Sequence, residues 1–229
     1  MSSEDERPWL AGDLVKQLDP MLTMLVTEPA SLSSVTNPDE ARRVHVADSL
    51  SGLAAEEVRS AARVADIGTG AGFPGIPLAV ALPGAHFTLI DSVGKKVRFI
   101  DRVIETLDLE NAVTIHARSE EVAAGPGSEA FDLVTARAVA PLEALAELAS
   151  PLLNEGGHLV AWKGEREFEE EEKLAGLEER LAMKLARVVP VRPYSKSRER
   201  HLYVVEKTGP TPHGLPRRPG MVRKRPLCA

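Results

Sequence analysis

The sequence predicts an α/β fold in which a mostly parallel sheet carries an antiparallel ribbon at one edge and follows a set of N-terminal helices. From residue 63 onward, short apolar runs alternate with amphipathic segments, which is typical of βαβ units in a parallel sheet. A glycine-rich turn joins the first apolar run to the segment after it. The residues before 63 have a helical apolar period instead.

The N-terminal part is expected to form a helical cap over residues 1–60. Apolar side chains recur there at three- and four-residue steps, namely Leu10, Leu14, Leu18, Met21, Leu22 and Leu25. A second helix is expected to start at Asn37, since Pro38 suits the first helical position and Glu40 completes a pattern like a capping box.

The main α/β domain is predicted over residues 61–207, where short apolar runs alternate with amphipathic segments. Strands are predicted at 63–67, 86–91, 112–116, 131–135 and 158–162. Helices are predicted at 75–82, 95–107, 141–153 and 167–184. Two further runs, 185–191 and 202–205, are expected to pair as the antiparallel edge ribbon. After Lys207 the chain is rich in Gly, Pro and Arg and is predicted to be a basic arm, 208–229, rather than a packed element.

Composition restricts the class of protein. With 229 residues, 43% of them hydrophobic, the chain can bury one domain of ordinary size, which argues against collagen-like and disordered classes. No apolar run approaches the length of about 18 residues of a membrane span, and the acidic N-terminus does not resemble a signal peptide. We expect a cytoplasmic protein whose single cysteine, Cys228, is a surface thiol, and we expect no metal site.

Charge is distributed unevenly along the chain. Residues 1–183 carry 16 Lys and Arg against 32 Asp and Glu, whereas residues 184–229 carry 12 against 2. A basic end on an acidic body predicts a polyanionic partner, although a solvated charged tail would have the same composition.

The most informative motif is ARVADIGTGAGFPGIPLA, residues 62–79. Its glycines, Gly68, Gly70 and Gly72, let a ligand approach the backbone between a strand and a helix, which predicts a nucleotide-type site. A dinucleotide fingerprint requires a third glycine where this chain has Phe73. We therefore favour a cofactor without a pyrophosphate, of which S-adenosylmethionine is the common one, over the NAD(P) of an oxidoreductase.

Polar residues follow the ends of the next strands, where ligands of open α/β sheets bind. Asp91, with its neighbour Ser92, is suited to accept hydrogen bonds from both ribose hydroxyls. Ser119 and Glu120 are candidates for reading the adenine edge, although Glu120 could instead be an exposed carboxylate at a helix start. Arg137 is expected to point toward the cofactor or the substrate, with a structural ion pair as the alternative.

Seven phrases in order carry a family resemblance: HVADSL (45–50), DIGTGAGFPGIPLA (66–79), LIDSVGKKVRFI (89–100), ARAVAPL (136–142), AWKGE (161–165), RHLYVVEK (200–207) and PRRPGMVRKRPL (216–227). Together they resemble the RsmG (GidB) family of bacterial 16S rRNA methyltransferases, over residues 37–227. The family's usual Asn-Leu-Thr segment is not recognisable; residues 31–36 stand in its place.

The resemblance implies a class I, Rossmann-like methyltransferase that uses S-adenosylmethionine to methylate N7 of guanine 527 in 16S rRNA. The cofactor residues it implies are Gly68, Phe73, Asp91, Ser119, Glu120 and Arg137. Because N7 carries a lone pair and no proton, the reaction needs no general base, and no catalytic residue is assigned beyond Arg137 as an orienting group that should approach O6. His45 and Asp48 are expected to anchor their helix against the sheet.

RNA binding is expected to fall to the basic C-terminal part. The candidates are Lys163, Lys196, Arg198, Arg200 and His201 at the crevice mouth, and Arg217, Arg218, Arg223, Lys224 and Arg225 on the arm. The partner implied is 16S rRNA or the small ribosomal subunit, and the chain is expected to be a monomer. An RNA-binding protein with a vestigial cofactor fold is the third reading, but the glycine loop is intact.

Overall fold

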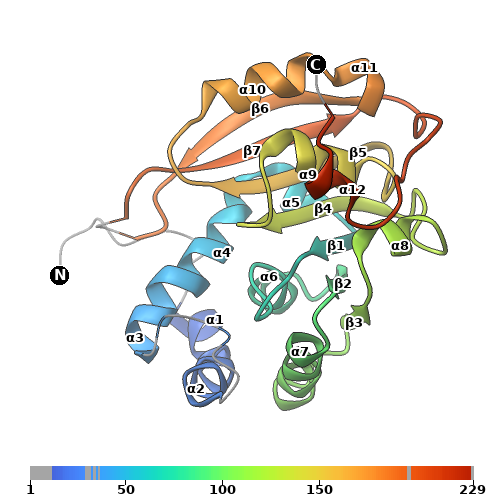
Figure 1. Ribbon diagram of the computed structural model, residues 1–229. Helices are drawn as coiled ribbons and strands as arrows, with labels where there is room; N and C mark the ends of the chain where they lie inside the picture. The colour runs from blue at the N-terminus through green and yellow to red at the C-terminus, as the bar shows by residue number, and fades with distance from the viewer. Residues whose placement is uncertain (1–11, 29–31, 33–34, 36, 195–196, 228–229) are drawn as a thin grey trace.

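The protein forms a seven-stranded sheet covered on both faces by helices, as a computed structural model shows (Figure 1). The structure describes residues 12–28, 32, 35, 37–194 and 197–227. The strand order is β3-β2-β1-β4-β5-β7-β6. The strands are β1 (Arg63–Ile67), β2 (His86–Asp91), β3 (Ala112–His116), β4 (Phe131–Arg137), β5 (Leu153–Lys163), β6 (Met183–Val191) and β7 (Arg200–Lys207).

Strands β1 to β5 are parallel, and β7 lies antiparallel between β5 and β6. The sequence-based prediction of a mostly parallel sheet with an antiparallel edge is therefore confirmed. The order reverses between β1 and β4, so a crevice opens at the carboxyl ends of these strands. Alternate residues of each strand enter different cores: Val64 of β1 packs with the N-terminal helices, and Ala65 packs on the other face.

The N-terminal helices cover the first face. They are α1 (Gly12–Gln17), α2 (Asp19–Thr27), α3 (Pro38–Ala41), the π-helical turn η2 (Arg42–Ala47), α4 (Asp48–Leu50), the 3₁₀ turn η3 (Ser51–Ala54) and α5 (Glu56–Ser60). Asn37 begins this run as predicted, because its side-chain oxygen accepts hydrogen bonds from the amides of Asp39 at 2.9 Å and Glu40 at 3.1 Å. The segments from α3 to η3 follow one another without a break and bring residues 44–48 to the sheet.

The remaining helices flank the sheet. They are α6 (Gly75–Ala81), α7 (Gly94–Thr106), α8 (Ser119–Ala123), α9 (Leu142–Ala149), α10 (Phe168–Ala175), α11 (Glu178–Leu181) and α12 (Met221–Lys224). Among the described residues, no helix is long and apolar enough to cross a membrane.

Two predicted elements differ from the structure. The helix expected at 141–153 ends at Ala149, and β5 starts at Leu153 rather than at 158. The earlier start of β5 includes a register shift opposite β4, where Gly156 adopts φ +78°. The helix expected at 167–184 is two helices, and α11 ends where Ala182 adopts a left-handed conformation at φ +51°.

The C-terminal segment is also more ordered than predicted. Lys207 is fully buried, and its Nζ donates to the side chain of Glu129 at 2.8 Å and to the carbonyl of Leu153 at 2.6 Å. Helix α12 follows, with Val222 buried, and packs beside α9 (Figure 1, red). The prediction of a tail without packed elements is therefore wrong: a short helix with one buried apolar side chain has too weak a period to be read from sequence.

Candidate active site

Two cavities lie side by side at the carboxyl ends of the parallel strands. Cavity A has a volume of about 690 Å³ and is lined by the strand-end segments 67–68, 90–93, 117–120 and 138–141 together with part of the C-terminal segment. Cavity B has a volume of about 400 Å³ and lies among η2, α4, the end of β4, the end of β5 and the start of β7. Ala138 lines both of them.

The glycine loop forms the floor of cavity A at Gly68. This residue has φ +63°, a left-handed conformation that favours glycine. A Cβ atom there would also lie 2.8 Å from Cγ2 of Val139. The backbone amide of Gly70 donates to Oδ2 of Asp91 at 3.0 Å, so the loop and the end of β2 hold each other.

Asp91 is an ordered, buried carboxylate at the wall of cavity A. Its Oδ1 accepts the amide of Val93 at 2.8 Å, and Nζ of Lys96 lies 3.4 Å from Oδ2. Oδ1 keeps a further lone pair beyond this contact, whereas Oδ2 is contacted by both the Gly70 amide and Lys96. Asp91 can therefore accept hydrogen bonds from a ligand without being reoriented.

Glu120 lies on the same wall, after β3. Its side chain is buried, with 7% of the residue exposed, so the alternative of an exposed carboxylate at a helix start is wrong. Ser119 Oγ donates to its Oε2 at 3.3 Å, and the amide of Gly220 donates to Oε1 at 2.7 Å. A residue near the C-terminus thus contacts a predicted cofactor residue directly.

Asp66 supports the loop from beneath and was not singled out from the sequence. It is fully buried, accepts Thr135 Oγ1 at 2.8 Å and the amide of Gly75 at 3.1 Å, and so joins β1, β4 and α6. Burial raises its pKa to about 6, against the opposing hydrogen bonds from Thr135 and Gly75. The sequence offers one sign of this role, an acidic residue within an otherwise apolar strand.

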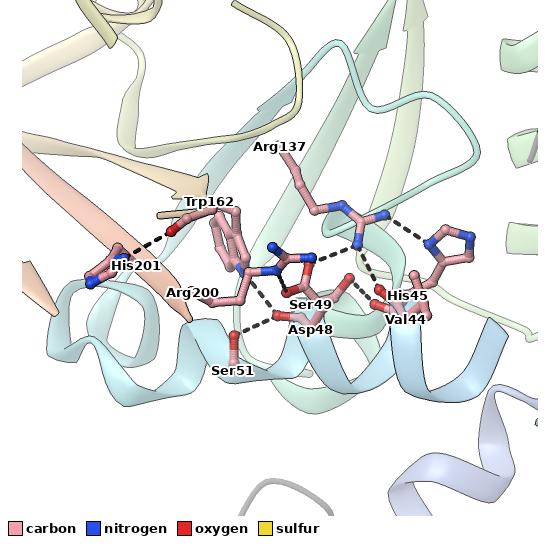
Figure 2. A network of polar contacts seen from close by, with 10 residues as sticks. Val44, His45, Asp48, Ser49, Ser51, Arg137, Trp162, Arg200 and His201 are labelled. Carbon is pink, nitrogen blue, oxygen red and sulfur yellow. Dashed lines mark hydrogen bonds and ion pairs between the residues drawn. The ribbon is translucent and has the colours of Figure 1, made fainter. Parts of the chain in front are cut away.

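Arg137 leaves the end of β4 into cavity B, where it meets groups from the N-terminal helices (Figure 2). Its Nη1 donates to Oδ2 of Asp48 at 3.0 Å, and its Nη2 lies 3.4 Å from Nδ1 of His45. The side chains of Arg137 and Asp48 are only 16% and 9% exposed. The structural ion pair, which the sequence left as the alternative for Arg137, therefore exists.

The other oxygen of Asp48 is less well satisfied. Oδ1 is buried and has no hydrogen-bond partner among the described residues, although Nε of Arg200 lies 3.5 Å away as an ion-pair contact. Trp162 Nε1 donates to the backbone carbonyl of Asp48 at 2.9 Å and fixes the helix against β5, as expected for this position (Figure 2).

Phe73 connects the glycine loop to cavity B rather than lining cavity A. Its ring stacks on His45 with centroids 4.8 Å apart, and the Arg137 guanidinium lies 5.3 Å from the ring centroid. Its bulk at the third-glycine position therefore supports the neighbouring cavity. The loop sequence does not show that Phe73 packs on His45 and Arg137.

Comparison with known proteins identifies the family. The family model described as GidB, rRNA small subunit methyltransferase G, matches residues 16–203. The chain belongs to the GidB family. A relative named ribosomal RNA small subunit methyltransferase G, from Desulfitobacterium hafniense (strain Y51), is 40% identical over 226 residues, covering 95% of this chain and 91% of the relative.

Solved structures agree on the fold of this GidB chain. A SAM-dependent methyltransferase from Aquifex aeolicus aligns with a TM-score of 0.54 and 17% identity, over 78% of this chain and 98% of that one. M. jannaschii TYW2 in complex with AdoMet aligns with a TM-score of 0.50 and 18% identity, over 66% and 71% of the two chains. The class I, Rossmann-like architecture expected from the sequence is thus confirmed.

The basic residues that the sequence nominated for RNA divide between the two cavities. Near cavity B, Lys163 forms an ion pair with Glu170 at 2.6 Å, and His201 Nδ1 donates to the carbonyl of Gly164 at 2.8 Å. In the C-terminal segment, Arg217 pairs with the buried Glu147. Arg200 is half-buried near Asp48, and the other described candidates are exposed: Arg198, Arg218, Arg223, Lys224 and Arg225. Lys196 lies outside the described residues.

His45 should remain neutral well below neutral pH. Burial, and secondarily the charge of Arg137, lower its pKa from 6.5 to about 4. A depressed folded-state pKa contributes stability that is present above pH 6.5 and is lost as the pH falls toward 4. In a ¹⁵N NMR titration, with His45→Gln to assign the resonance, we expect the imidazole midpoint near 4. A midpoint near 6.5 would contradict the buried arrangement.

Proposed function

We propose that this protein transfers the methyl group of S-adenosylmethionine to N7 of a guanine in 16S rRNA, expected at position 527. The observation that carries the proposal is the pair of cavities that meet at Ala138. Ala138 has φ +56°, uncommon for a residue with a Cβ and often found at functional sites. This turn at the end of β4 would let a cofactor and a base approach each other.

Cavity A has the polar groups that S-adenosylmethionine requires, and its volume is in the usual range for such ligands. The carboxylate of Asp91, next to Ser92, would accept the ribose hydroxyls. Ser119 and Glu120 would read the adenine edge, and Gly68 leaves room for the ligand against the backbone. Gly70 would act indirectly, through its amide hydrogen bond to Asp91.

Cavity B has the groups that complement guanine. Guanine carries an acceptor at O6 and donors at N1 and the exocyclic amine. Arg137 supplies the donor for O6, and Asp48, with an Oδ1 that lacks a hydrogen-bond partner among the described residues, supplies the acceptor. Phe73 would hold Arg137 in place through the cation–π contact.

The chemistry asks the protein mainly to orient two reactants. Bound S-adenosylmethionine would supply the methyl group from its sulfonium, with cleavage of the C–S bond accompanying formation of the N7–C bond and a neutral thioether as the leaving group. No proton moves, so cavity B needs no base. Positive charge develops on the guanine ring, and the low pKa of His45 keeps its imidazole neutral beside that ring. Arg137 on O6 rather than N7 avoids opposing the developing charge.

The RNA backbone would be bound by basic residues of the C-terminal part, namely Lys163, Arg198, Arg200, His201, Arg218, Arg223, Lys224 and Arg225, together with Lys196, which lies outside the described residues. The polyanionic partner inferred from the uneven charge is thus 16S rRNA or the small subunit that contains it. A ribosomal substrate would place the enzyme in the cytoplasm, and we infer that it acts as a monomer.

The decisive experiment is transfer of labelled methyl from S-adenosylmethionine to small-subunit RNA that lacks this modification. The RNA is supplied both naked and as particles, then digested to nucleosides and analysed by mass spectrometry. We expect 7-methylguanosine at one site. Binding of S-adenosylhomocysteine without any methylated nucleoside would retain the cofactor assignment and reject the substrate.

A further inference from the structure

The C-terminal segment, residues 217–226, forms part of the wall of cavity A. Gly220, Val222, Arg223 and Pro226 all line the cavity, together with the strand-end segments. The sequence suggested a role in RNA binding for this basic stretch. Its position next to Ser119 and Glu120, the residues predicted to bind adenine, indicates a second role.

A buried ion pair holds the segment in place. Nε and Nη2 of Arg217 both bind the carboxylate of Glu147 on α9, the second at 2.7 Å, in a bidentate arrangement. Glu147 is 3% exposed at the side chain and Arg217 is 20% exposed. Nη1 of Arg217 also donates to the carbonyl of Arg225 at 2.8 Å, so one guanidinium secures both ends of the segment.

The segment in turn contacts Glu120. The amide of Gly220, at φ +79°, donates to Oε1 at 2.7 Å just before α12, and Val222 is buried in the next turn. Because Oε1 is engaged by a backbone group, the orientation of the whole carboxylate is set, and Oε2 retains a lone pair for a further donor. The exocyclic amine of adenine is such a donor.

We propose that Arg217 is a positioning residue for cofactor binding. By holding residues 217–226 on Glu147, it keeps the wall of cavity A closed and the carboxylate of Glu120 oriented toward the adenine of the bound nucleoside. The inference rests on the proposed function, since it takes cavity A as the S-adenosylmethionine site.

The test compares Arg217→Met with Arg218→Met, which removes the same charge from an exposed neighbour. Binding of S-adenosylhomocysteine and of adenosine is measured by isothermal titration calorimetry. We expect both ligands to bind about tenfold more weakly to the Arg217 variant, the effect of losing one charge-assisted contact, and within about twofold of wild type to the control. Arg217→Lys should recover part of the affinity, because a cation remains next to Glu147.

Turnover distinguishes positioning from general damage. In the Arg217 variant, the KM for S-adenosylmethionine should rise about tenfold, with kcat and the KM for RNA within about twofold of wild type. A fall in kcat with an unchanged KM for S-adenosylmethionine would overturn the proposal. A wild-type protein that fails to bind S-adenosylhomocysteine would reject the proposed cofactor as well, whereas equal binding by wild type and variant would reject this inference alone.

A second variant keeps the ion pair intact, in case Arg217→Met does not fold. Gly220→Ala strains the left-handed backbone without a steric clash, as does Gly214→Ala, at φ +94°, away from Glu120. We expect about fivefold weaker S-adenosylhomocysteine binding for Gly220→Ala, from the cost of a left-handed non-glycine residue, and wild-type binding for Gly214→Ala. Equal binding by these two variants would overturn the contact between Gly220 and Glu120 as a determinant.

Discussion

Gly68→Ala is expected to weaken S-adenosylhomocysteine binding by at least about 30-fold, because two penalties add at the floor of cavity A. The left-handed backbone at φ +63° costs a residue with a Cβ about 1–2 kcal/mol. The new Cβ would also lie 2.8 Å from Val139 Cγ2, and overpacking of this kind costs about 1–3 kcal/mol. Calorimetric titration gives the affinity, and urea unfolding should show that the free energy of unfolding falls by about 2–5 kcal/mol, the sum of the two penalties.

Gly70→Ala is the matched control for this substitution. Its φ of +66° is almost the same, but the nearest atom to a new Cβ is the carbonyl oxygen of Gly68 at 3.8 Å. We expect Gly70→Ala to carry only the penalty of the left-handed backbone, about 1–2 kcal/mol, without the steric penalty of Gly68→Ala. Equal losses of affinity in the two variants would show that Val139 does not limit the space at the loop.

Arg137→Ala is expected to lower both stability and methyl transfer. The substitution leaves the Asp48 carboxylate buried with Arg200 as a distant partner at 3.5 Å, which should lower the free energy of unfolding by about 3 kcal/mol. Methyl transfer to 16S rRNA should fall about 100-fold, because the guanine loses its O6 donor and its orientation. Denaturant unfolding and single-turnover transfer below the melting temperature measure the two effects separately.

The double variant Arg137→Ala, Asp48→Ala separates the roles of this pair. Removing both charges eliminates the buried, unpaired carboxylate, so most of the lost stability should return. Activity should stay at least as low as in Arg137→Ala, since the guanine then lacks both its donor and its acceptor. Recovery of activity together with stability would mean that the pair is only structural.

Much of the fold could be predicted because the signals are local. The strands β1, β2 and β3 lie at the predicted residues 63–67, 86–91 and 112–116, and Asn37 caps its helix through amides two and three residues away. Asp91 could be placed at a ligand wall from its position at the end of a strand, because the carboxyl ends of parallel strands meet at one edge of a sheet. These predictions require only neighbouring residues and a general rule of topology.

The partners within the site could not be predicted in the same way. Local periodicity shows neither that the C-terminal segment packs beside α9 nor that Arg137 points toward Asp48. A basic stretch of sequence is the same whether its arginines meet solvent, phosphate or a buried glutamate. Phe73 likewise fills a space that exists only after His45 and Arg137 have been brought above it.

Local patterning thus established the sheet, the glycine loop and the strand-end residues, since helical and strand periods and turn conformations depend on residues close in the chain. Folding added the contacts that complete the site: Arg137 with Asp48 across 89 residues, Gly220 with Glu120 across 100, and Arg217 with Glu147 across 70. Each such contact joins elements whose separation is set by the packing of both helical layers on the sheet, and so no local sequence pattern specifies it.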